Sequence, residues 1–171
     1  MFARLPELID AIRLADEGAR LRGELSAGGL QRLRELSRSG VPPAPVIVDL
    51  EFERTGHGVR LMHGTIRTTV EAVCQRCLQP ATLAVMARSF VVLQVAGEEP
   101  VSGPEEAEVL VVEGPLSLNE LAEDELLLAM PMIPMHEEGA CAAPRDLGEA
   151  PPEPLEKPNP FSVLRGLKGK D

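Results

Sequence analysis

Apolar and acidic residues alternate along the chain from Val46 to Glu53. The apolar positions are Val46, Val48, Leu50 and Phe52, and the acidic positions are Asp49, Glu51 and Glu53. Successive side chains of a β-strand point to opposite faces of the sheet. This period of two therefore predicts a strand with one buried face and one exposed face.

Three further segments carry strand signals. Residues 59–73 are rich in β-branched side chains and follow a Gly-containing turn, so we interpret them as the antiparallel partner of the first strand. After a turn at 74–77, residues 81–95 are predicted to form a third long strand, and residues 109–112 a short one. The pattern predicts an antiparallel β-meander over about residues 46–112, either open or curled toward a barrel.

A helix is predicted over about residues 118–130. Ser117 is suited to be its N-cap, and Glu120 stands three residues further on, which is the pattern of a capping box. Pro131 ends the helix, because a proline lacks the backbone N–H that the helix needs. We expect this helix to pack on the sheet, which makes the fold class α+β.

A second, shorter helix is predicted after Ser26, which is suited to be its N-cap. Leu30, Leu33 and Leu36 recur at helical spacing, and the helix is expected to end near Gly40. Residues 41–45 contain three prolines, so they are predicted to form an extended connector.

The C-terminal region differs from the rest of the chain. Residues 1–141 are predicted to form the single α+β domain, and residues 142–158, with five prolines and several acids, a linker. Asn159 and Pro160 then open a short amphipathic helix in the segment 159–171. Its apolar face consists of Phe161, Leu164 and Leu167. We expect this helix to dock, either on its own domain or on a partner.

Composition narrows the functional class. Of 171 residues only 2% are aromatic, with no Trp and no Tyr, which argues against surfaces that stack nucleic-acid bases on aromatic rings. The longest apolar run is far below the roughly 20 residues of a membrane span, and no secretory signal opens the chain. Together with an odd number of cysteines, three, these features predict a protein of the reducing cytoplasm that does not enter a membrane.

Charge is unevenly distributed. The net charge is −10, with 12 basic and 10 acidic side chains in residues 1–90 but 5 basic and 17 acidic in residues 91–171. Such a balance repels phosphate backbones, so DNA binding is not expected. A local basic surface in the first half remains one interpretation, and a solvated face is the other. The residues concerned are Arg13, Arg20, Arg22, Arg32, Arg34 and Arg38.

The cysteine pair Cys74-x-x-Cys77 lies at a predicted strand turn, where both thiolates can point to one place. His136 and Cys141 would complete a Cys3His set for a structural zinc ion, because imidazole and thiolate both suit zinc. Two alternatives remain open: cysteines that stabilise the turn without metal, and a redox pair. A redox pair is expected at a helix N-terminus rather than between strands.

Signals for catalysis are poor. The sequence contains no Gly-rich nucleotide loop, no paired-histidine zinc motif and no nucleophile elbow. The acidic cluster Glu123-Asp124-Glu125 is interpreted as a solvated helix start that the helix dipole favours, with a divalent-cation site as the alternative. We therefore expect a protein that is not an enzyme.

Four stretches in this order and spacing carry a resemblance to a known family. They are Cys74-Gln75-Arg76-Cys77-Leu78-Gln79-Pro80, the stretch 123–136 from Glu123-Asp124-Glu125 to His136, Cys141, and the stretch 157–164 with Asn159-Pro160-Phe161. Together they resemble the YceD family, the large ribosomal RNA subunit accumulation proteins of bacteria and plastids. The resemblance covers about residues 45–168.

The resemblance implies a non-enzymatic accessory role in the synthesis, processing or stability of 23S ribosomal RNA and in large-subunit assembly. Two modes are open: RNA contact through the first-half arginines and Arg76, or capture of a basic large-subunit ribosomal protein by the acidic half. The acidic charge favours the second mode. One rival is a thiol–disulfide or metal-handling module centred on Cys74 and Cys77, and another is an adaptor with no link to RNA.

Overall fold

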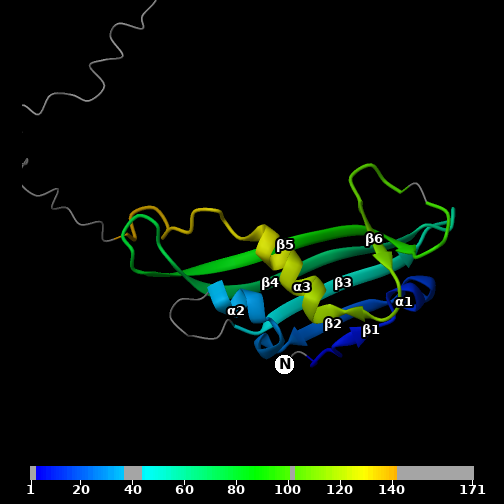
Figure 1. Ribbon diagram of the computed structural model, residues 1–171, viewed down its shortest axis with the longest axis horizontal. Coiled ribbons are helices and arrows are strands. Elements are labelled where there is room, and N and C mark those ends of the chain that lie inside the picture. Colours follow the sequence, from blue (N-terminus) through cyan, green and yellow to red (C-terminus); the bar gives the residue numbers. More distant parts are fainter. Residues whose placement is uncertain (1–2, 37–43, 101–102, 142–171) are drawn as a thin grey trace, which may run out of the picture. The chain divides into compact units, whose positions relative to one another are not determined.

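The computed structural model describes residues 3–36, 44–100 and 103–141, which belong to one compact unit, Met1–Cys141. A five-stranded sheet forms its centre (Figure 1). The strands are β2 (Arg20–Leu25), β3 (Val46–Arg54), β4 (Arg60–Val73), β5 (Pro80–Val95) and β6 (Glu108–Val112), and they lie side by side in that order. The α+β class is thereby confirmed, and the sheet is open rather than closed into a barrel.

The three long strands form the expected meander. Antiparallel pairs join β2 to β3, β3 to β4 and β4 to β5. The predicted short strand near residues 109–112 is present as β6, but it pairs parallel with β5 from Val91↔Glu108 to Val95↔Val112, so the sheet is mixed rather than wholly antiparallel. Because Glu108 pairs with Val91 and Val112 with Val95, β6 runs in the same direction as β5.

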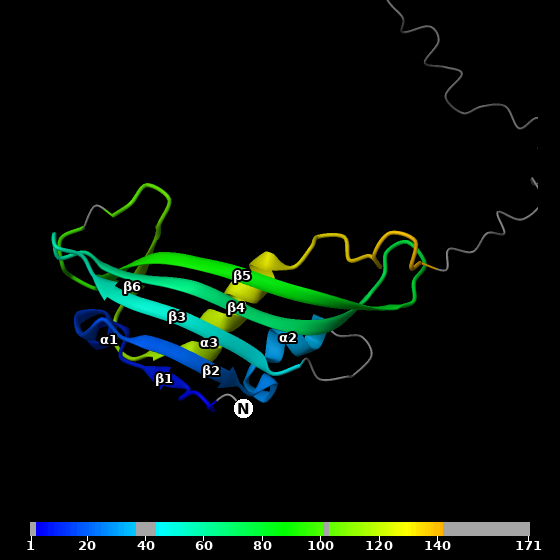
Figure 2. The same cartoon turned by 180° about the vertical axis from the view of Figure 1, so that it is seen from behind.

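The alternation in β3 is confirmed as the burial pattern. Val46, Val48, Leu50 and Phe52 are buried in the main core, while the residues between them are not. The helices α1 (Ala11–Glu17), α2 (Gln31–Leu36) and α3 (Leu118–Ala129) contribute residues to the same core. They cover one face of the sheet, and α3 lies diagonally across it (Figure 1, Figure 2).

α3 begins as the sequence indicates. The Ser117 side chain accepts a hydrogen bond from the backbone N–H of Glu120 at 3.3 Å, as an N-cap does. The helix ends one residue before the predicted limit, at Ala129. Its buried residues are Leu118, Leu121, Ala122, Glu123 and Leu126, and Leu128 is 83% exposed.

The N-terminal region is richer in structure than predicted. α1 and β2 were not expected, and a short ladder joins β1 (Leu8–Ile9) to β7 (Leu116–Ser117). After Ser26 a single 3-10 turn, Ala27–Gly29, precedes α2, so the predicted cap is displaced from the helix. The two glycines in this turn disfavour an α-helical first turn.

Some predictions lie outside the described residues. These are the linker at 142–158 and the docking helix with Phe161, Leu164 and Leu167, which stay predictions. Within the described part of the chain, no helix combines the length and apolar character that crossing a membrane requires.

Candidate metal centre

The turn between β4 and β5 is built around Cys74. The Cys74 N–H donates to the Gln79 carbonyl at 2.9 Å, and the Leu78 N–H donates to the Cys74 carbonyl at 2.8 Å. Leu78 takes a left-handed backbone conformation with φ of 59°, which lets the chain reverse directly after Cys77. Cys74 is fully buried, and Cys77 is half-buried.

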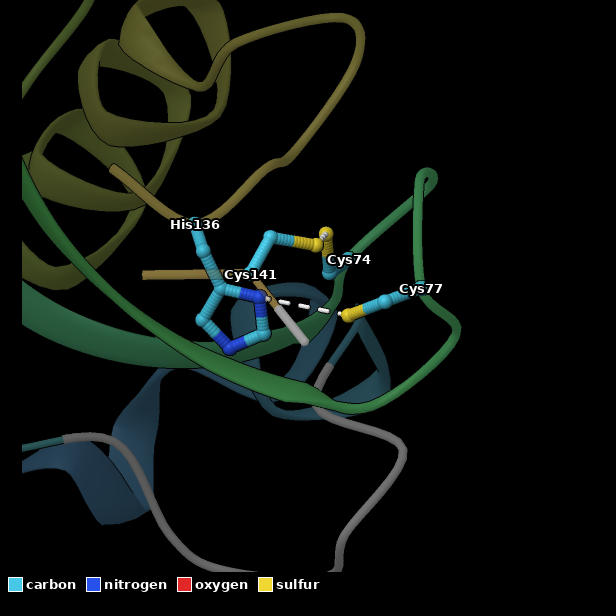
Figure 3. A group of neighbouring side chains, drawn as sticks. All are labelled: Cys74, Cys77, His136 and Cys141. Atoms are coloured by element: carbon cyan, nitrogen blue, oxygen red, sulfur yellow. Dashed lines mark hydrogen bonds between the residues drawn. The ribbon is translucent and has the colours of Figure 1, made fainter. Parts of the chain in front are cut away.

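The segment that follows α3 returns to this turn. The Gln75 N–H donates to the Pro134 carbonyl at 2.8 Å, which places His136 and Cys141 beside the cysteine pair. The four ligand atoms all lie within 4.8 Å of one another. Figure 3 shows the side chains converging from the hairpin and from the post-helix segment. These four residues, which we call the Cys3His cluster, could hold a metal ion.

The distances fit tetrahedral zinc. With Zn–S and Zn–N bonds of about 2.3 and 2.05 Å, a tetrahedron places two sulfurs about 3.8 Å apart and a sulfur and a nitrogen about 3.6 Å apart. The Sγ atoms of Cys74 and Cys141 lie 3.8 Å apart, and Cys77 Sγ lies 3.4 Å from His136 Nδ1. These two edges therefore match a zinc site, and the other ligand atoms, all within 4.8 Å of one another, would need to close by at most about 1 Å.

A hydrogen bond selects the tautomer of His136. Its Nε2 lies 2.9 Å from the Pro80 carbonyl oxygen, which can only accept, so Nε2 carries the proton. The lone pair of the neutral ring is then on Nδ1, the nitrogen that faces the cysteines. Metal-binding histidines commonly donate their other ring N–H to such a carbonyl. No sequence pattern marks Pro80 for this role, because the bond is made by its backbone.

Two of the three thiols, Cys74 and Cys141, lie in an environment that favours thiolate. For Cys77, a backbone hydrogen bond from Gln79 lowers the pKa, but hydrogen bonds to Cys141 and Cys74, together with burial, outweigh it and raise that pKa. Burial raises the pKa of Cys74, but hydrogen bonds from the backbone N–H groups of Cys77, His136 and Arg76 outweigh it and lower that pKa to about 5. Burial also raises the pKa of Cys141, and hydrogen bonds from Cys77, Arg76 and His136 bring it below its ordinary value. Backbone N–H groups aimed at sulfur stabilise the negative charge that a metal-bound thiolate carries.

Arg76, predicted as an RNA contact, belongs to this centre. A hydrogen bond to Cys141 and the nearby thiol sulfurs raise the pKa of its guanidinium. Three thiolates and a neutral imidazole around Zn²⁺ would carry one net negative charge, which the guanidinium would offset.

Four of the other arginines predicted to contact RNA are in ion pairs. The pairs are Arg13 with Glu17, Arg20 with Asp49 and Glu51, Arg22 with Asp49, and Arg32 with Glu123 and Asp124. Hydrogen bonds to these carboxylates raise the pKa of Arg13, Arg20 and Arg32. Arg34 is exposed on α2, and Arg38 lies outside the described residues. Of these six arginines the structure describes all except Arg38, and none of the described five belongs to the Cys3His cluster.

In the acidic cluster Glu123-Asp124-Glu125, the first residue is buried and links α3 to α2. The interpretation of the cluster as a solvated helix start was therefore wrong for Glu123. Glu123 is 6% exposed and accepts hydrogen bonds from Arg32 Nε at 2.8 Å and from the Leu33 N–H at 3.0 Å. Glu125 accepts from the Ser89 hydroxyl at 2.8 Å. The sequence contained a signal for the burial of Glu123, because this residue is three positions before Leu126 and lies on the same helix face.

The fold and the cluster together define a class: an α+β protein with an open sheet whose longest hairpin meets a post-helix segment at three cysteines and one histidine. The family described as "Large ribosomal RNA subunit accumulation protein YceD" matches residues 62–168. The chain is 32% identical over 173 residues to the "Large ribosomal RNA subunit accumulation protein YceD" of Haemophilus influenzae, covering 98% of each chain. The chain therefore belongs to the YceD family, as its motifs indicated. No solved structure matches it significantly.

Proposed function

We propose that this protein acts without catalysis, in the cytoplasm, to support the accumulation of 23S ribosomal RNA during assembly of the large subunit. Its family and its Haemophilus influenzae relative are named for large ribosomal RNA subunit accumulation. Of the two modes of action, binding a basic large-subunit ribosomal protein fits this chain better than binding RNA.

One observation carries the choice of mode. The first-half arginines that RNA binding would need are largely engaged by carboxylates of the chain itself, as for Arg20 with Asp49 and Arg32 with Glu123. Phosphate binding would have to displace these intramolecular partners. The second half carries 17 acidic against 5 basic side chains, which attracts a basic protein and repels RNA.

Affinity capture with nuclease treatment tests this function. Tagged full-length protein is recovered from growing cells with and without RNase, next to an untagged control. We expect basic large-subunit ribosomal proteins to co-purify in both samples. Recovery of 23S rRNA that depends on intact RNA, with no ribosomal protein retained after RNase, would support the RNA mode instead. Recovery of neither would contradict the assembly role.

We further propose that the Cys3His cluster holds one structural zinc ion. The donor types, the 3.8 and 3.4 Å separations and the tautomer of His136 all support this. Bound zinc would fasten the post-helix segment to the β4–β5 turn with four ligands and no open position for substrate. A closed site of this kind stabilises the fold and does not take part in thiol exchange.

Metal analysis of purified protein separates the zinc proposal from the thiol–disulfide rival. We expect about one zinc per chain and slow reaction of the three thiols until a chelator is added. A metal-free protein that cycles between a dithiol and a disulfide under mild redox buffers would contradict the zinc proposal and support the rival.

A further inference from the structure

β5 has an unpaired backbone edge over most of its length. β6 pairs with it only from Val91 to Val95, and β4 occupies its other edge. Within the described ranges no strand pairs with residues 81–90 on the β6 side (Figure 1, Figure 2). Backbone N–H and C=O groups that point to that side can accept an added strand.

A hollow of about 540 Å³ follows this edge from Met86 to Val91. Leu128 and Ala129 at the end of α3 form one wall, and Glu106 and Glu108 close the end next to β6. Six strand residues span about 20 Å, which is enough for one extended segment of another chain. We call this hollow the β5 groove.

Side chains along the groove divide by face. Ala87, Ser89 and Val91 are buried on the α3 side, so the alternation puts Met86, Arg88 and Phe90 on the opposite face, and among the described residues Arg88 is the one basic residue that lines the groove. Met86 is 54% exposed there. A strand added along β5 would therefore present one row of side chains to α3 and the other row to Met86 and Phe90.

The α3 side of the groove is acidic. Glu108 stands in register with Val91, and Glu125 accepts a hydrogen bond from Ser89 at 2.8 Å, so both carboxylates lie on this side. Neither these two nor Glu106 is in an ion pair with any residue of the described ranges. On this side, basic side chains of an added strand would meet Glu108 and Glu125, while Arg88 lies on the opposite face of the strand.

We infer that the β5 groove binds an extended segment of a basic protein by strand addition. The segment pairs with the backbone of Met86–Phe90, directs Lys or Arg toward Glu108 and Glu125, and places apolar residues beside Met86 and Phe90. RNA does not fit the groove, because its phosphates would meet carboxylates and it cannot complete a β-ladder. That the partner is a ribosomal protein rests on the proposed function, whereas the chemistry of the segment does not.

The test titrates isotope-labelled full-length protein with the blocked peptide Lys-Val-Lys-Val-Lys-Val-Lys and follows the backbone amide signals. We expect shifts centred on Met86–Phe90 and slower hydrogen exchange there. The same peptide with every backbone nitrogen methylated keeps its side chains but loses its donors, and should bind at least about tenfold more weakly. A short oligouridylate should leave these amides unshifted.

Charge reversal supplies matched protein variants. The double variant Glu106→Lys/Glu108→Lys should bind the peptide at least about tenfold more weakly. Glu53→Lys/Glu71→Lys makes the same change in net charge on β3 and β4, away from the groove, and should retain binding within about twofold.

The inference would be overturned by no shifts at Met86–Phe90, by equal binding of the methylated peptide, or by equal losses in the two double variants. Shifts at these amides with oligouridylate instead of the peptide would overturn it as well. Because the titration contains no ribosomal component, its failure would leave the role in 23S rRNA accumulation standing. An unchanged 23S rRNA level in cells without the protein would overturn that role and not the binding result.

Discussion

At the scale of single residues, His136 connects the two segments of the centre, because its Nδ1 faces Cys77 and its Nε2 bonds to the Pro80 carbonyl. The ligand types and the Cys74-x-x-Cys77 spacing were readable from the sequence, because they follow from zinc chemistry. The bond from Nε2 to the Pro80 carbonyl and the N–H groups around Cys74 were not, since backbone geometry decides them.

Cys74→Ser and Cys77→Ser should each destabilise the protein strongly and should not be additive. Loss of one ligand removes most of the zinc affinity, and zinc at 1,000 times its dissociation constant stabilises the native state by about 4 kcal/mol. The second substitution then has little left to remove. Denaturant unfolding of the two single variants and the double variant measures this.

Two controls define that experiment. Gln79→Ala changes an exposed side chain of the same turn and should cost less than about 0.5 kcal/mol. With a strong chelator present, wild-type protein should fall close to the cysteine variants. A shared zinc site would be contradicted if the cysteine substitutions caused small, additive losses in the free energy of unfolding and if the chelator had no effect on the wild-type protein.

At the scale of elements, Glu123 joins α3 to α2. Its carboxylate caps the first turn of α2 through the Leu33 N–H and also pairs with Arg32, while Asp124 binds the same arginine at 2.7 Å from an exposed position. A carboxylate from another helix replaces the serine cap that the sequence suggested. Pairing between distant segments of this kind is invisible to a local capping rule.

Glu123→Ala should lower the free energy of unfolding by about 1–3 kcal/mol, because the buried Leu33 N–H loses its acceptor. Asp124→Ala removes only the exposed ion pair to Arg32 and should cost less than about 1 kcal/mol. Denaturant unfolding of both variants provides the comparison. Equal losses of unfolding free energy in the two variants would mean that the hydrogen bond from the Leu33 N–H to Glu123 does not stabilise the fold.

Gly64→Ala should destabilise the sheet by more than about 2 kcal/mol. Gly64 has φ of 152°, and a Cβ there would collide with the Asp49 carbonyl oxygen on β3. Gly56→Ala, in the exposed β3–β4 turn, meets no atom within 4 Å and is the matched control, expected to stay within about 0.5 kcal/mol. A mild effect at Gly64 in thermal unfolding would show that β3 and β4 can separate to make room.

The elements that the sequence predicted well share one property. In β3 apolar residues largely alternate with polar ones, and α3 has a clear N-cap and one apolar face. The buried residues of both elements therefore follow from the local sequence pattern. β2, with Arg20 and Arg22 on its exposed face, is short and has weak alternation, and it is held by pairing with β3. The parallel direction of β6 follows from the register in which Glu108 meets Val91, and this register has no local signal in the sequence.

At the scale of the whole molecule, ion pairs make the free energy of unfolding depend on pH. Hydrogen bonds from Arg60 lower the pKa of Asp16, and hydrogen bonds from Arg20 lower that of Asp49. A carboxyl whose pKa is lower when folded stabilises the fold above its unfolded pKa, about 3.9, and this stability is lost as pH falls through the folded pKa.

The free energy of unfolding should therefore decrease as pH is lowered from about 5 to about 2. Asp16→Asn with Asp49→Asn should make this decrease shallower, and Arg60→Met should do so in part by removing one of the two arginine partners of Asp16, the other being Arg54. Denaturant unfolding at a series of pH values measures the slope. An identical slope in the wild type and in all variants would contradict the assignment of these two pairs.

The central claim is that the protein supports accumulation of the large-subunit ribosomal RNA. The most direct measurement is the ratio of 23S to 16S rRNA in cells that lack the protein, with and without the full-length chain restored. We predict that the ratio falls when the protein is absent and recovers when it is supplied. A ratio that stays the same in all three conditions would contradict the claim.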